Sequence, residues 1–230
     1  MTASSIDESE VGQINQVVCV MTHLRAGSGL LSSLLDSHPN LLSTPDDILM
    51  GFYEFWDKHG ELAAEELVLA FLDYYAVLFD AWSTCKCPRV GPNVGDDLNW
   101  TTLGADRDEK LYVDQEVFKS AMEGFLSTRG KVSRKLFFQA LHAAYAKALG
   151  WQVENAQIVF GLHVPQDRPL QQFFADFPDG RFLQMTRHPI SALSSHFRHY
   201  FQSGYLHPNA APGMVSRAIS GPFVPRKSYA

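Results

Sequence analysis

An apolar strand, a turn with two glycines and an apolar helix follow one another over residues 17–40, and this order constrains the fold more than any other feature. Residues 17–21 are apolar and rich in β-branched side chains, which predicts a buried strand. The glycines let a ligand approach the backbone closely, and the first turn of a helix offers unpaired N–H groups and a dipole that favours an anion. Arg25 adds a planar cation suited to phosphate or sulfate oxygens. The segment therefore predicts a site for an anionic ligand.

The overall composition is that of an ordinary globular chain. Its 230 residues are 46% hydrophobic and 19% charged, which argues against disorder and fits a single domain over residues 1–230. The net charge of −6 argues against a nucleic-acid-binding surface. The three cysteines Cys19, Cys85 and Cys87 are too few for a zinc site or a disulfide framework, so we expect no metal and a reducing, cytoplasmic location. The N-terminal residues show no signal-peptide pattern, and no segment is apolar enough to predict a membrane span.

The remaining segments predict a parallel sheet interrupted by a helical insert. A β–loop–α unit opens the chain and a β–α–β–α unit closes it, which predicts an α/β fold with a parallel sheet flanked by helices. We expect residues 16–47 and 156–206 to form a cofactor-binding core, and residues 48–150 to form a mainly helical insert on the substrate side. Further strands are expected at 41–42, 157–162 and 181–186, helices at 48–59, 61–82, 114–128, 133–149, 170–177 and 189–205, and a loop at 83–108.

Polar segments directly follow three of the predicted strands. These segments are residues 23–29, residues 163–165 and residues 187–189. Ligands of open α/β sheets bind at the carboxyl ends of the strands. We therefore expect the three segments to line one crevice.

The turn after the first strand resembles the 5′-phosphosulfate loop of sulfotransferases that use 3′-phosphoadenosine-5′-phosphosulfate (PAPS). Arg25-Ala26-Gly27-Ser28 fits the family pattern of a cation, a small residue, a glycine and a hydroxyl, and residues 36–39 fit the end of the following helix. Gly29 stands where the family usually has a second hydroxyl. The resemblance implies a P-loop-like sulfotransferase core of the bacterial type with a large helical insert. It also implies that residues 25–29 bind the 5′-phosphosulfate.

The third strand end carries a second resemblance to the same family. Arg187 and Ser195 are eight residues apart, which is the family's spacing between the arginine and the serine that bind the 3′-phosphate. Eight residues are slightly more than two helical turns, so the hydroxyl faces back towards the strand end. The resemblance implies that Arg187 and Ser195 bind the 3′-phosphate. A surface ion pair for Arg187 and a helix-face hydroxyl for Ser195 are the alternative interpretations.

His163 is the expected general base. Sulfuryl transfer to a hydroxyl needs a group that accepts the proton, and histidine suits this task because its unperturbed pKa is about 6.5. Residues 161–165 match the histidine and proline of the family's Lys-Thr-His-Leu-Pro but lack its lysine. His196, His188 and Glu54 remain alternative bases.

The resemblance implies in-line transfer of a sulfuryl group from PAPS to a hydroxyl, which releases adenosine 3′,5′-bisphosphate without a metal. Arg25 and the N–H groups of the turn would stabilise the charge on the bridging oxygen. The many aromatic residues of the insert indicate a small or carrier-bound, apolar acceptor, and the sequence does not indicate an oligomeric state. Two alternatives stay open. A non-catalytic or truncated sulfotransferase-like binding domain would explain why few residues follow Arg187, whereas a P-loop kinase is disfavoured because the turn has no lysine.

Overall fold

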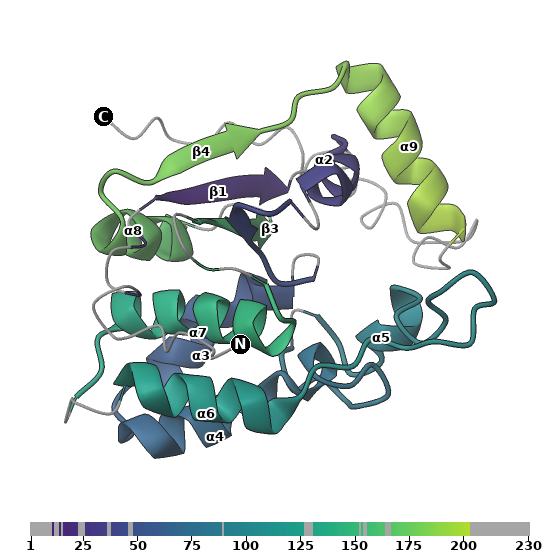
Figure 1. Cartoon of the computed structure of the whole chain (residues 1–230). Coiled ribbons are helices and arrows are strands. Elements are labelled where there is room, and N and C mark those ends of the chain that lie inside the picture. The colour runs from purple at the N-terminus through teal and green to yellow at the C-terminus, as the bar shows by residue number, and fades with distance from the viewer. Residues whose placement is uncertain are drawn as a thin grey trace.

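A parallel β-sheet forms the centre of the fold. In the part of the chain that the structure describes it has four strands, ordered β2-β3-β1-β4, and Figure 1 shows β3, β1 and β4 side by side. Every pairing is parallel, which confirms the prediction of an α/β fold with a parallel sheet flanked by helices. The strands are β1 (Val17–Thr22), β2 (Leu41–Leu42), β3 (Gln157–His163) and β4 (Arg181–Gln184). The computed structural model describes residues 11, 14, 16–22, 26–35, 38–45, 48–88, 90–126, 131–151, 153, 156–163 and 167–202.

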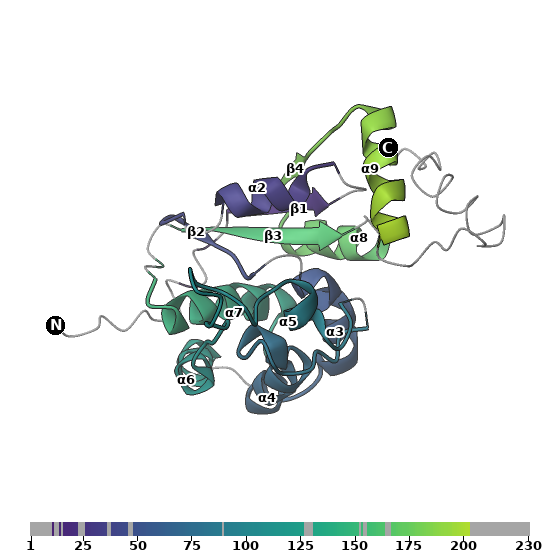
Figure 2. The same ribbon diagram turned by 90° about the vertical axis from the view of Figure 1, so that its right-hand side faces the viewer.

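The helices fall into two groups along the chain. Those of the sheet-forming part are α2 (Ser28–Leu35), α8 (Asp167–Asp176) and α9 (Pro189–Gln202). Those of the insert are η1 (Ile48–Gly51), α3 (Phe52–His59), α4 (Ala64–Tyr74), η2 (Ala76–Leu78), α5 (Val94–Asp97), α6 (Gln115–Leu126) and α7 (Arg134–Ala148). Figures 1 and 2 show α3, α4, α6 and α7 gathered on one side of the strands.

Hydroxyl and carboxylate caps fix the starts of two insert helices. The Ser133 hydroxyl accepts a hydrogen bond from the Leu136 N–H at 3.2 Å and begins α7. The Asp114 carboxylate accepts from the N–H groups of Glu116 at 2.9 Å and Val117 at 3.2 Å and begins α6. Each cap satisfies N–H groups that the first turn of a helix leaves unpaired. The predicted starts of these two helices, 133 and 114, therefore coincide with the caps.

The sheet and the insert share one hydrophobic core. The Phe138 ring of α7 lies 5.1 Å from the Phe160 ring of β3, 5.0 Å from the Phe52 ring of α3 and 5.4 Å from the Phe177 ring after α8. All four rings are buried within one continuous cluster of hydrophobic side chains. Because burial of aromatic area dominates the energetics of a core, these rings bind the insert to the sheet.

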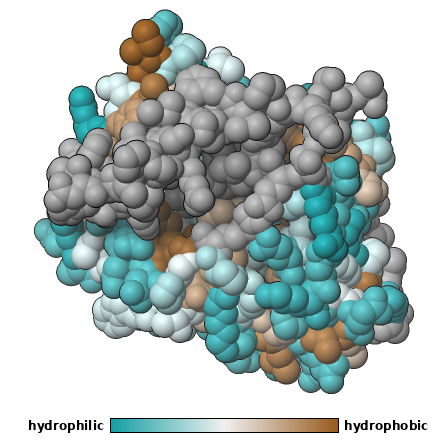
Figure 3. Space-filling view, turned by 180° about the vertical axis from the view of Figure 1, so that it is seen from behind, coloured by the Kyte–Doolittle hydropathy of each residue, from teal (hydrophilic) through white to brown (hydrophobic). Residues whose placement is uncertain are grey.

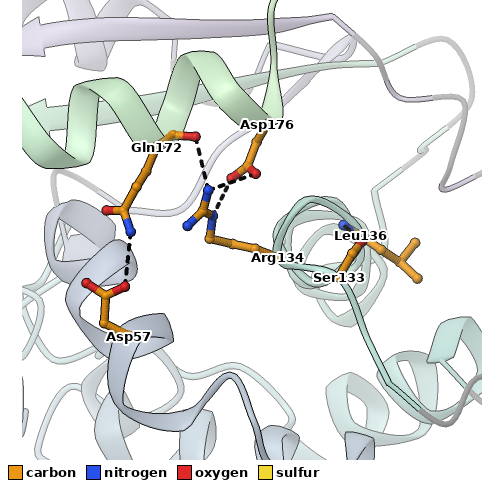
Figure 4. Close-up of polar contacts among 6 residues, drawn as sticks. All are labelled: Asp57, Ser133, Arg134, Leu136, Gln172 and Asp176. Carbon is orange, nitrogen blue, oxygen red and sulfur yellow. Dashed lines mark hydrogen bonds and ion pairs between the residues drawn. The ribbon is translucent and has the colours of Figure 1, made fainter.

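A polar cluster also joins α8 to the insert (Figure 4). Arg134 of α7 donates through Nε and Nη2 to the two carboxylate oxygens of Asp176, at 2.6 and 3.0 Å, and Nη2 also donates to the Gln172 carbonyl at 3.3 Å. The Gln172 side chain donates to Asp57 of α3 at 3.0 Å, and Asp57 forms an ion pair with Arg168 at 2.9 Å. The cluster therefore fixes α8, which leads into β4, against two insert helices.

The prediction of one long helix over residues 61–82 is wrong in the extent of that helix. α4 ends at Tyr74, the backbone of Tyr75 leaves the helical region with φ −115° and ψ 37°, and a short 3₁₀ helix follows. The Tyr74 carbonyl accepts a hydrogen bond from the Lys86 N–H at 3.0 Å, a contact with a segment outside the helix. The expected loop at 83–108 likewise contains the short helix α5, and α8 begins at Asp167 rather than 170.

No helix in the described residues has the length and apolar character needed to cross a membrane. Figure 3 shows the side opposite to the view of Figure 1, where the described surface is mainly hydrophilic and its hydrophobic areas are small and separate. Small separate hydrophobic areas of this kind are normal for protein surfaces.

Candidate functional site

The ends of three strands lie at one edge of the sheet. β1 lies between β3 and β4, and in the parallel register Thr22 pairs with His163 while Met21 pairs with Gln184. The carboxyl ends of these three strands therefore lie side by side, while residues 23–25 and 164–166 lie outside the described residues. The shared edge agrees with the predicted parallel sheet, and the meeting of the polar segments in one crevice stays a prediction.

The turn after β1 leads directly into α2. Gly27 has φ +106°, a conformation that residues with a Cβ rarely adopt, and its carbonyl accepts the Leu31 N–H at 3.1 Å. The helix begins at Ser28, so its first-turn N–H groups point away from the helix body towards the turn. Ala26, Gly27 and Ser28 are half-buried, Gly29 is exposed, and the expected cation Arg25 lies outside the described residues.

The segment after β4 lies against this turn. A methyl group placed on Gly27 would lie 3.7 Å from Cε of Met185, the residue that follows β4. Arg187 stands two residues further on and is exposed, and Ser195 is half-buried on α9. The two segments that resemble the sulfotransferase cofactor motifs therefore come together in space, although 158 residues separate their nearest members, Gly27 and Met185.

The expected proton acceptors occupy different places. His163 is the last residue of β3, at the shared strand edge, and its side chain lies outside the described part of the chain. His196 on α9 is buried, with 7% of its surface exposed. His188, which directly precedes α9, is exposed. Glu54 lies in the first turn of α3. Burial, together with the neighbouring Cys87, Glu54 and Cys85, raises the pKa of Tyr74 to about 12.

A large cavity adjoins the turn, and sequence reasoning did not anticipate it. Its volume is about 630 Å³, and it extends from α2 and the faces of β1 and β3 to the insert. Two features of the sequence were signals that the prediction did not use. They are the polar pair Ser43-Thr44 directly after β2, and the tryptophans Trp100 and Trp151 in segments without a predicted element. The lining residues are Val20, Gly29, Ser32, Ser33, Leu35, Ser43, Thr44, Pro45, Trp100, Leu103, Leu111, Tyr145, Leu149, Trp151, Val159 and Gly161.

The buried cysteines do not assemble a metal centre. Cys19, Cys85 and Cys87 are buried cysteines that form no disulfide, and burial raises the pKa of the Cys85 thiol to about 11. Among the described residues, no three side chains of histidine, cysteine, aspartate or glutamate lie close enough to hold a metal ion. The protonated thiol of Cys85 therefore behaves as a small apolar group in the core.

Comparison of the chain with protein-family models, with curated proteins and with solved structures found no match in any of the three. The functional conclusion therefore depends on the residues at the strand edge, on the turn before α2 and on the cavity beside it.

Proposed function

We propose that the chain transfers a sulfuryl group from PAPS to the hydroxyl of an apolar acceptor. The observation that carries the proposal is the closeness of the turn at Gly27 to Met185 after β4, whose Cε lies 3.7 Å from the position that a Cβ on Gly27 would take. PAPS bears phosphates on both sides of its ribose, so it needs two anion sites at a fixed separation. A helix N-terminus after one strand and an arginine after the neighbouring strand supply two such sites.

The anion sites have separate roles. The N–H groups of the first turn of α2 and the Ser28 hydroxyl hold the 5′-phosphate, and Arg25 stabilises the negative charge that develops on the bridging oxygen. Arg187 and Ser195 hold the 3′-phosphate. PAPS supplies a sulfuryl group activated by its bond to phosphate.

The proton of the acceptor goes to a residue of the strand edge. As the acceptor oxygen forms its bond to sulfur, the bond from sulfur to the bridging oxygen breaks and adenosine 3′,5′-bisphosphate leaves. His163 accepts the hydroxyl proton, because it ends the strand next to β1 and has the residue type suited to neutral pH. The scheme balances without a metal or a redox partner.

Calorimetric titration with adenosine 3′,5′-bisphosphate in the absence of Mg²⁺ tests the proposal. We expect micromolar binding to the intact chain and at least a tenfold loss of affinity for Arg25→Ala and for Arg187→Ala. Arg181→Ala is the matched control, because Arg181 is an exposed arginine at the opposite end of β4. Its affinity should stay within about twofold of the intact chain.

The same titration separates the alternatives. Binding without sulfuryl transfer to any alcohol would support a binding domain that lacks turnover. Absence of binding to the intact chain at millimolar ligand would overturn the proposal, and binding that requires Mg²⁺ would favour a P-loop kinase.

A further inference from the structure

The cavity beside α2 is built to hold an uncharged, largely apolar molecule. Its apolar walls include the indoles of Trp100 and Trp151 and the leucines at 103, 111 and 149. Both indoles are half-buried and pack against the hydrophobic core, so the core holds their positions. None of the described lining residues carries a charge. The described part of the lining therefore offers a charged ligand no countercharge.

The described cavity wall includes the hydroxyl side chains of serine and threonine. Ser32 and Ser33 come from α2, and Ser43 and Thr44 come from the segment that follows β2. Hydroxyls both donate and accept hydrogen bonds, so they suit an alcohol group on the ligand. A volume of about 630 Å³ lies within the usual range of small-molecule sites. The two tryptophans among the lining residues favour a ligand with flat rings, which stack on aromatic faces.

Gly29 connects the cavity with the turn before α2. It is the second residue of that helix, it is exposed, and it contributes to the cavity wall. A Cβ placed on Gly29 would meet no heavy atom within 4 Å, so the space beside the first turn is open. A side chain at this position would occupy that space without displacing any described neighbour.

We propose that the cavity binds the acceptor, a neutral alcohol with flat apolar rings, and that Gly29 leaves the opening through which its hydroxyl reaches the sulfuryl group. This inference rests on the proposed function, because the first turn of α2 is where the phosphosulfate would lie. Gly29 is then the residue that decides whether an acceptor in the cavity reaches the reacting atoms.

Binding of 2-naphthol, a neutral flat alcohol, tests the cavity by calorimetry without nucleotide. We expect binding to the intact chain and at least a tenfold weaker affinity for Trp151→Ala. Ser33→Trp should weaken it similarly by filling the cavity from an exposed position on α2, where folding is not at risk. Trp82→Ala is the control, because Trp82 is 72% exposed and does not line the cavity. An affinity that neither cavity variant changes would overturn the proposal.

The opening is tested by Gly29→Leu, with Gly124→Leu as its matched control. Gly124 is also an exposed helical glycine with open space beside it, but it lies on α6 and does not line the cavity. We expect Gly29→Leu, measured at saturating PAPS and acceptor, to lose at least tenfold in the rate of transfer relative to Gly124→Leu. Transfer by Gly29→Leu at the rate of Gly124→Leu would overturn the role of Gly29.

The two ligands separate the two proposals. If the bisphosphate binds and neither Trp151→Ala nor Ser33→Trp changes the affinity for 2-naphthol, the assignment of the cavity to the acceptor is wrong and the proposed function stands. If 2-naphthol binds in the cavity and the bisphosphate does not bind, sulfuryl transfer is wrong, and the assignment of the cavity to an acceptor is overturned with it.

Discussion

His142 is a fully buried histidine whose protonation works against folding. Its Nδ1 lies 2.8 Å from the Phe138 carbonyl oxygen, and its Nε2 is buried with no hydrogen-bond partner among the described residues. Burial lowers the pKa of the imidazole from 6.5 to about 4. Because the unfolded chain takes up this proton near pH 6.5 and the folded chain only near pH 4, the free energy of unfolding falls between these values as the pH drops. We expect this contribution to reach about 3 kcal/mol, and urea unfolding over this pH range measures it.

Replacing the imidazole by an apolar side chain isolates its effect. His142→Leu should flatten the pH dependence of the free energy of unfolding between pH 6.5 and pH 4. Below pH 4, the difference in the free energy of unfolding between the variant and the intact chain should stay constant. His38→Leu is the control, because His38 is exposed, and it should leave the slope unchanged. A slope that persists undiminished in His142→Leu would assign the acid sensitivity to other groups.

Single residues were predictable where their role is local. The turn after the first strand needs a residue that tolerates positive φ, and Gly27 fulfils this need with φ +106°. The state of His142 was not predictable, because its burial depends on segments distant in sequence. Phe138, which lies one turn before it, packs at the same time on β3, on α3 and on the residues after α8.

At the scale of elements, the ion pair of Arg134 and Asp176 holds α8 against α7. The two side chains are 19% and 11% exposed, and Arg134 donates two hydrogen bonds to the carboxylate. Removing one partner leaves the other poorly solvated, so we expect Arg134→Met or Asp176→Leu to lower the free energy of unfolding by about 2–4 kcal/mol. Urea unfolding measures both variants and the double variant. The double variant should lose less than the sum of the two single losses, because it leaves no unpaired charge.

An exposed ion pair provides the comparison for this prediction. Lys131 and Glu61 lie 2.7 Å apart, with side chains 71% and 89% exposed. Lys131→Met should change the free energy of unfolding by no more than about 0.5 kcal/mol, because water screens an exposed pair. Equal losses for Arg134→Met and Lys131→Met would contradict the structural role of the α7–α8 pair.

Elements with strong local signals were predicted well, and their ends less well. The strands at 17–22 and 157–163 and the helices with capped starts at 115 and 134 follow from apolar periodicity and capping residues. The end of α4 at Tyr74 depends on a hydrogen bond from Lys86 and on the buried position of Tyr75, and neither is visible in the local pattern. The Arg134–Asp176 pair also escaped prediction, because 42 residues separate its members.

At the scale of the whole molecule, the order of elements predicted more of the candidate site than any single motif. Parallel strands end at one edge, so the meeting of the carboxyl ends of β1, β3 and β4 followed from the βα pattern alone. The cavity did not follow from it. Its wall combines residues of α2, two strands, the segment after β2 and the insert, and only the folded packing of the insert places Trp100 opposite α2.

The shared core leads us to expect that the sheet and the insert unfold together. Phe138 contacts Phe52, Phe160 and Phe177, so Phe138→Ala removes contacts on both sides of the boundary between sheet and insert. We expect it to lower the free energy of unfolding by about 3–5 kcal/mol, the usual loss for a buried phenylalanine. Leu69→Ala, a change at a residue 47% exposed on α4, should cost less than about 1 kcal/mol.

In each variant, urea transitions followed by tryptophan fluorescence and by far-ultraviolet circular dichroism should coincide, because a single cooperative unit has one transition. The four tryptophans, Trp56, Trp82, Trp100 and Trp151, lie in or next to the insert, so fluorescence reports on the insert while circular dichroism reports on all elements. A fluorescence transition that moves in Phe138→Ala while a separate circular dichroism transition stays in place would show that the insert unfolds independently of the sheet.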